Sequence, residues 1–83
     1  MAESMWLQVE IGEGMFPNER AVSFLTSEGE NVSLFVPNTQ VEAPGRLRVR
    51  VLDCDARVGL VELPAQKLSG GSVVRVERER LQK

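Results

Sequence analysis

Three arginines alternate with three apolar residues over residues 46–51 of the chain. On a β-strand, Arg46, Arg48 and Arg50 would project from one face at intervals of about 6.5–7 Å. That interval approximates the spacing of phosphates along a single strand of nucleic acid, and guanidinium groups bind phosphate and stack on bases. The segment therefore indicates an arginine-lined strand that could bind single-stranded RNA or DNA. The basic residues that could widen this patch are Arg75, Arg78 and Arg80.

The same arginines also fit an ordinary salt-bridged surface. Carboxylates on neighbouring strands could lie opposite them, and each such cross-strand pair contributes about 0.2–1 kcal/mol. The chain has ten Lys and Arg against twelve Asp and Glu, a formal net charge of -2 and a pI of about 5.1. This balance opposes a general phosphate binder, whose affinity depends on a net positive field. The candidate carboxylate partners are Glu10, Glu62, Glu77 and Glu79.

Asp53, Cys54 and Asp55 form a second group of polar residues with possible chemistry. In extended geometry the two carboxylates share a face and could supply oxygen ligands to Mg²⁺ or Ca²⁺, but no further carboxylate is close in sequence. Asp also forms turns by accepting hydrogen bonds from its own backbone, and a turn is the favoured interpretation. Cys54 lies between two acids, and we expect it to be a surface thiol or a partly buried small residue and not a nucleophile.

The composition excludes several kinds of active site. The 83 residues contain no His and a single Cys. Ser-His and Cys-His nucleophilic sites and imidazole acid–base chemistry are therefore excluded. One thiol can form neither an internal disulfide nor a structural zinc site. We expect a non-enzymatic protein with no metal, no cofactor and no small-molecule substrate.

Apolar residues alternate with polar ones in six segments, the pattern typical of β-strands. The connections between them are short and carry Gly, Pro and Asp, which implies antiparallel neighbours. Pro44 and Gly45 favour a type II turn, in which Gly accepts a positive φ. Residues 64–68 could form one helical turn, with Pro64 at its first position. The expected strands are residues 5–11, 20–26, 31–36, 46–51, 58–63 and 72–77.

These elements predict one all-β domain over residues 1–83, because a chain of this length cannot hold a second core. The expected fold is a small antiparallel β-barrel of about six short strands with at most one short helical turn. A barrel buries the apolar faces and removes most exposed edges. Barrels of the SH3-like or OB-like type have this size, and a two-sheet sandwich is the alternative.

Charge is unevenly distributed along the chain. Residues 1–44 contain seven acids and one base, for a net charge of -6, whereas residues 45–83 contain five acids and nine bases, for a net charge of +4. Such a chain could associate head-to-tail or by strand exchange. If the two groups meet within one domain, they neutralise each other instead.

Three aromatic residues are candidate anchors for a protein partner. Trp6 falls on the polar phase of its strand, and Phe35 is also out of phase with the apolar positions of its own. Either could be exposed, or could cap an open barrel end. Phe16 lies in the apolar loop formed with Met15 and Pro17, which could contact a partner or plug the barrel mouth.

The sequence therefore predicts a small binding or assembly module that acts on another protein or on a second copy of itself. A single-strand RNA or DNA binder using Arg46, Arg48 and Arg50 is the alternative. The first residues lack the basic region and apolar run of a signal peptide, and no stretch approaches the roughly 18 apolar residues of a membrane helix. We expect a cytoplasmic protein without membrane contact.

Overall fold

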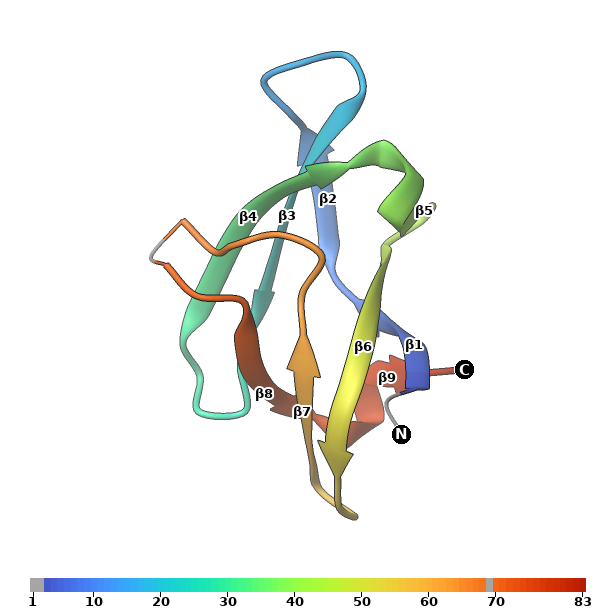
Figure 1. Ribbon diagram of the computed structural model, residues 1–83, viewed down its shortest axis with the longest axis vertical. Helices are drawn as coiled ribbons and strands as arrows, with labels where there is room; N and C mark the ends of the chain where they lie inside the picture. The colour runs from blue at the N-terminus through green and yellow to red at the C-terminus, as the bar shows by residue number, and fades with distance from the viewer. Residues whose placement is uncertain (1–2, 69) are drawn as a thin grey trace.

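Two antiparallel β-sheets make up the fold (Figure 1), and the computed structural model describes residues 3–68 and 70–83. The smaller sheet contains β2 (Glu10–Glu13), β3 (Glu19–Leu25) and β4 (Asn31–Pro37), paired in that order. The strands of the larger sheet are β1 (Glu3–Gln8), β5 (Val41–Glu42), β6 (Arg46–Cys54), β7 (Val58–Glu62), β8 (Val73–Glu77) and β9 (Leu81–Gln82). Their order is β8-β7-β6-β1-β9, with β5 paired beside β6.

The expected all-β, antiparallel class is confirmed, but a closed barrel is not, because neither sheet closes on itself. The predicted strand over residues 5–11 is interrupted at Val9, where the chain passes from β1 in the larger sheet to β2 in the smaller one. Two backbone hydrogen bonds each join a loop of one sheet to the edge strand of the other. The Ser27 N–H donates to the Arg75 carbonyl at 2.9 Å, and the Leu68 N–H donates to the Ser33 carbonyl at 2.9 Å.

The helical turn expected over residues 64–68 is wrong. The Leu68 N–H is bonded to β4, and the Lys67 N–H donates to the Gly71 carbonyl at 2.8 Å, so these donors serve a loop instead of a helical ladder. The helical turns in the described part of the chain are two single 3₁₀ turns, η1 (Asn38–Gln40) and η2 (Arg78–Arg80). The two-residue strands β5 and β9 were not predicted.

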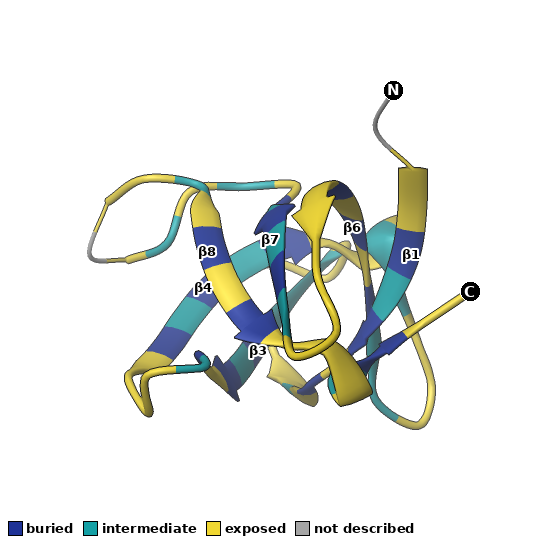
Figure 2. Ribbon diagram, turned by 90° about the horizontal axis from the view of Figure 1, so that it is seen from below, coloured by how far each residue is buried: buried dark blue, intermediate teal, exposed yellow. Residues whose placement is uncertain are grey.

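The core lies between the inner faces of the two sheets (Figure 2), and it follows the predicted alternation. In β6, buried Leu47, Val49 and Val51 alternate with arginines that face outward. Phe24 is the one aromatic residue among the buried core residues, so aliphatic side chains fill most of the interior. The buried apolar residues are Met5, Leu7, Val9, Val22, Phe24, Val32, Leu34, Val36, Leu47, Val49, Val51, Val61, Leu63, Val74, Val76 and Leu81.

The pairing of β1 with β6 sets both the core and the outer face of the larger sheet. Leu7 lies opposite Leu47, and both side chains are fully buried. One position along, Trp6 lies opposite Arg48 on the outer face. Because successive side chains alternate, one register fixes both pairs.

Gly45 permits a close approach between the β5–β6 turn and the bend between β1 and β2. The Val9 N–H donates to the Gly45 carbonyl at 2.9 Å. A Cβ atom at Gly45 would lie 2.4 Å from the Val9 carbonyl oxygen. Gly45 is not among the glycines with positive φ, so the expected type II turn is wrong. The requirement for glycine here comes from space and not from backbone conformation.

We therefore expect Gly45→Ala to destabilise the fold by about 1–3 kcal/mol, because the backbone must move to admit the methyl group. The free energy of unfolding from urea titration measures this loss. Gly12→Ala is the matched control, since the nearest atom to its new Cβ would be the Ala21 carbonyl oxygen at 4.0 Å. Equal effects of the two substitutions would contradict the steric explanation.

Candidate functional site

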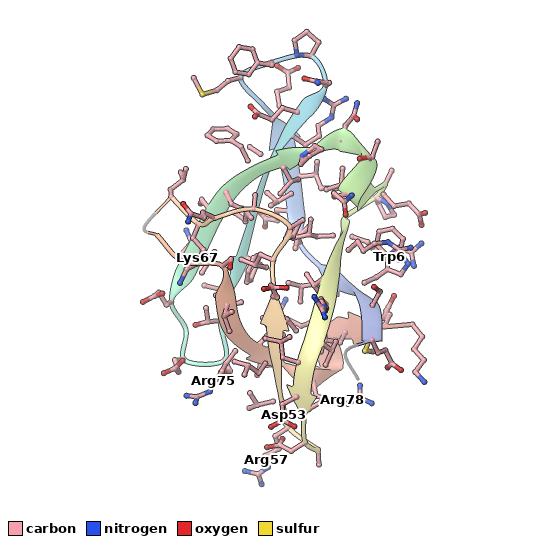
Figure 3. All side chains as sticks on the ribbon, in the orientation of Figure 1. Trp6, Asp53, Arg57, Lys67, Arg75 and Arg78 are labelled. Atoms are coloured by element: carbon pink, nitrogen blue, oxygen red, sulfur yellow. The ribbon has the colours of Figure 1, made fainter. Side chains whose placement is uncertain are left out.

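Trp6, Arg46, Arg48 and Arg50 form one surface on the outer side of β1 and β6, which we call the Arg–Trp face. The Cζ atoms of Arg46 and Arg48 lie 5.0 Å and 4.8 Å from the centroid of the Trp6 ring. Figure 3 shows Trp6 on the outside of the sheet, beside polar side chains. Cation–π attraction of this kind contributes about 0.5–1 kcal/mol at exposed sites, so the ring orders both guanidinium groups.

Two of the three arginines are paired with carboxylates. Arg46 forms an ion pair with Glu42, which lies directly opposite it on β5. Arg50 lies opposite Glu62 on β7, with 3.6 Å between Nη1 and Oε1. Within the described part of the chain, Arg48 has no ion pair and contacts the Trp6 ring. Arg48 is therefore the guanidinium of this face that remains free for an external anion.

A shallow groove of about 240 Å³ lies beside Arg48 and Arg50. It follows from the strand pattern, because β5 and β7 pair with different parts of the same side of β6 and leave a gap between them. The groove offers hydrogen-bonding side chains and a proline surface next to the free guanidinium. Its other lining residues are Ser4, Gln40, Val49, Glu62, Leu63 and Pro64.

Met15, Phe16 and Pro17 form the second exposed feature, the apolar tip, in the loop between β2 and β3. Met15 is 73% exposed and Phe16 is 62% exposed, so this loop does not plug the interior. Figure 1 shows it at one end of the long axis of the molecule. The Glu19 carboxylate accepts a hydrogen bond from the Met15 N–H at 3.1 Å. The Arg20 guanidinium donates to the carbonyls of Glu19 and Pro17 at 2.9 Å and 3.3 Å.

The other predicted site residues lie apart from the Arg–Trp face. Arg75 is exposed on the edge strand β8, separated from β6 by β7 with its Glu62. Arg78 lies in η2, beyond the end of β8, and Figure 3 shows the two arginines well apart. Phe35 lies opposite Ala21 on the smaller sheet and is half-buried. Arg75 and Arg78 therefore do not extend the Arg–Trp face, contrary to the prediction of a wider arginine patch.

Sequence reasoning missed Glu42, Gln40 and Ser4 at this face. Glu42 precedes Arg46 by four residues across the Pro44–Gly45 segment, so a tight hairpin there would have placed the two side chains opposite each other. No comparable pattern marked Gln40 or Ser4. Their proximity to Arg48 depends on strand order.

Asp55 organises the turn between β6 and β7. Its carboxylate accepts hydrogen bonds from the N–H groups of Arg57 at 2.7 Å and Val58 at 2.8 Å. The bonds from Val58 and Arg57, in that order, lower the pKa of Asp55 from its ordinary value, and the Arg57 charge adds to the effect. Cys54 is exposed, with its Sγ 3.4 Å from the Asp55 carbonyl oxygen. The predicted turn role therefore holds for Asp55, whereas Asp53 and Cys54 are the last residues of β6 and pair with β7.

No protein-family model, curated protein or solved structure matches the chain. Across residues 3–68 and 70–83, no group of three His, Cys, Asp or Glu side chains is placed to hold a metal ion. No helix in the same part of the chain combines the length and apolar character needed to cross a membrane.

We predict a measurable coupling between Trp6 and Arg48. A double-mutant cycle of Trp6→Leu and Arg48→Gln should give a coupling of about 0.5–1 kcal/mol in the free energy of unfolding, from the lost cation–π contact. The matched cycle pairs Trp6→Leu with Arg50→Gln, because Arg50 lies opposite Ser4 and Glu62. That cycle should give a coupling below about 0.3 kcal/mol. Equal couplings in the two cycles would contradict a specific Trp6–Arg48 interaction.

We also predict that Asp55 makes the stability of the fold depend on pH in the acidic range. The pKa of Asp55 is lower in the folded state than in the unfolded state. Its contribution to the free energy of unfolding is therefore fully present above the pKa of the unfolded state, and it is lost as the pH falls through the pKa of the folded state. Asp55→Asn should therefore destabilise the protein at neutral pH, and the difference from wild type should vanish in acid. Urea midpoints measured across the acidic range test this. Asp53→Asn is the control, since that carboxylate accepts one N–H bond, from Cys54. A pH-independent difference for Asp55→Asn would contradict the prediction.

Proposed function

We propose that this protein is a small, barrel-like, non-enzymatic binding module that recognises a protein surface through the apolar tip. The observation that carries the proposal is the exposure of Met15 and Phe16 at the end of a hydrogen-bonded hairpin. The exposed Cys54 thiol is typical of a reducing compartment, and we propose the cytoplasm as the location of the module.

The tip has the physical character of a contact loop. Among the large apolar side chains that are exposed in the described structure, Met15 and Phe16 lie next to each other at this tip instead of filling the core. Aromatic anchors dominate the energy of many protein interfaces. The Glu19 carboxylate accepts a hydrogen bond from the loop backbone, and the Arg20 guanidinium donates to it. These bonds restrain the loop, which lowers the entropy lost on binding.

The Arg–Trp face supplies a second, polar contact surface. Trp and Arg are enriched among the residues that dominate interface energy. Stacking on Trp6 orders the Arg48 guanidinium before a partner arrives, and no intramolecular ion pair of the described residues competes for it. A carboxylate of the partner could therefore accept both hydrogen bonds of the guanidinium fork.

A single-strand RNA or DNA binder remains the alternative function, and the charges of the face support it less well. Arg46 and Arg50 are already paired, and the carboxylates of Glu42 and Glu62 would repel a phosphate chain that continued past Arg48. The guanidinium groups also cover the Trp6 ring, which reduces its value as a platform for a base. A local contact with one carboxylate suits this surface better than a phosphate track.

Site-specific photocrosslinking tests the proposed function. A photoreactive phenylalanine analogue at position 16, incubated with an extract of the source cells, should give discrete protein adducts. The same analogue at position 28, exposed in the loop between β3 and β4, is the matched control and should give few. Met15→Ser should weaken the adducts at position 16, because it removes apolar contact from the same tip.

Equal adducts at positions 16 and 28, or none at either, would count against a protein-binding tip. The alternative function makes a separate prediction. A labelled single-stranded oligonucleotide would bind at low salt, and the triple substitution of Arg46, Arg48 and Arg50 by Ser would remove that binding while Phe16→Ser would not.

A further inference from the structure

We infer that the protein surface recognised is a second copy of this chain, and that the apolar tip of one copy docks on the Arg–Trp face of the next. This inference rests on the proposed function and names its partner. The charges of the two sheets, the free groups on each and their directions in the fold support this partner.

The two sheets carry opposite net charge. The smaller sheet with its loops, residues 9–37, contains five acids and one base, for a net charge of -4. The rest of the chain, with the larger sheet, contains seven acids and nine bases, for a net charge of +2. Because the sheets pack through their inner faces, their outer faces point in opposite directions. Two copies can therefore place an acidic surface against a basic one.

The acidic surface includes the apolar tip. The ion pairs found among the described residues use Glu42, Glu62 and Glu77, none of which lies in the smaller sheet. Glu13 is exposed at the base of the tip, opposite Arg20. The Arg20 guanidinium is directed to backbone carbonyls of its own loop, so the Glu13 carboxylate is left without an ion pair there. The Glu13 carboxylate thus lies beside the apolar tip.

The Arg–Trp face offers the complementary groups. Arg48 has an ordered guanidinium without an ion pair in the described structure, and the groove beside it contains Ser4, Gln40 and Pro64. In the inferred contact, Glu13 of one copy accepts hydrogen bonds from Arg48 of the next. Phe16 then packs against Pro64 in the groove beside Arg48. A contact of this kind combines apolar burial with one charge-assisted pair.

The contact cannot form within one copy. The tip lies at one end of the long axis (Figure 1), and its loop is bonded to its own hairpin through Glu19 and Arg20. The Arg–Trp face lies on the outer side of the other sheet. The two copies therefore use different surfaces, which makes the interface heterologous. Repeating the contact gives a ring where the rotation between copies closes and an open filament where it does not.

Two complementary variants test this inference. The tip variant carries Glu13→Gln, Met15→Ser and Phe16→Ser and keeps an intact face. The face variant carries Arg46→Gln and Arg48→Gln and keeps an intact tip and Trp6. Wild-type protein should sediment as larger species with increasing concentration at low salt, and added salt should weaken this association. Each variant alone should associate at least about tenfold more weakly.

The decisive measurement is an equimolar mixture of the two variants. The intact tip of the face variant should dock on the intact face of the tip variant, giving a 1:1 dimer that cannot grow. The emission of Trp6, the single tryptophan, should change on mixing. Circular dichroism of each variant verifies that it is folded.

Two outcomes would overturn the inference. Wild-type protein that stays monomeric at all concentrations in low salt excludes self-association. Variants that each form dimers alone, with no further change on mixing, indicate a symmetric interface through another surface. Either result leaves the proposed function intact if position 16 still crosslinks to a different protein, so the two failures are distinguishable.

Discussion

The antiparallel register between β1 and β6 is the constraint on which both the core and the candidate site depend. It places Leu7 opposite Leu47 in the interior and Trp6 opposite Arg48 outside. A shift of one residue would carry leucines to solvent and arginines into the core, where an unpaired charge costs several kcal/mol. The large energetic preference for burying the aliphatic residues therefore also fixes the much weaker contacts of the outer face. Trp6 meets Arg48 because Leu7 must meet Leu47.

The ion pairs of the outer face matter for charge availability more than for stability. The side chains of Arg46, Glu42, Arg50 and Glu62 are all at least one-third exposed. Such exposed pairs contribute about 0–1 kcal/mol each, which is small beside the core. Their effect is to neutralise two of three neighbouring guanidinium groups. A strand that resembles a uniform cationic track in sequence becomes, in the folded sheet, one free arginine between two neutralised ones.

The sequence predicted what local alternation controls and missed what strand order controls. The pattern over residues 46–51 located β6 and its outward arginines, and the phase of Trp6 correctly placed it on the polar side. Two-residue strands have no periodicity, so β5 and β9 could not be found. Glu42 therefore went unrecognised as the partner of Arg46. The two parts of the sequence have net charges of -6 and +4, but the two sheets have net charges of -4 and +2, because Glu3 and Glu42 belong to the larger sheet.

The sheet edges favour association through side chains over strand exchange. Unpaired strand edges invite pairing with another chain unless they are short, charged or covered. β9 has two residues, and β2 has four, with exposed glutamates at both ends. Hydrogen bonds to Arg75 and Ser33 partly occupy the edges of β8 and β4. These features leave exposed side chains as the groups for the proposed contact between copies. Met15 and Phe16 lie in a loop of the smaller sheet, and Arg48 lies on the larger sheet. The proposed association is therefore directional.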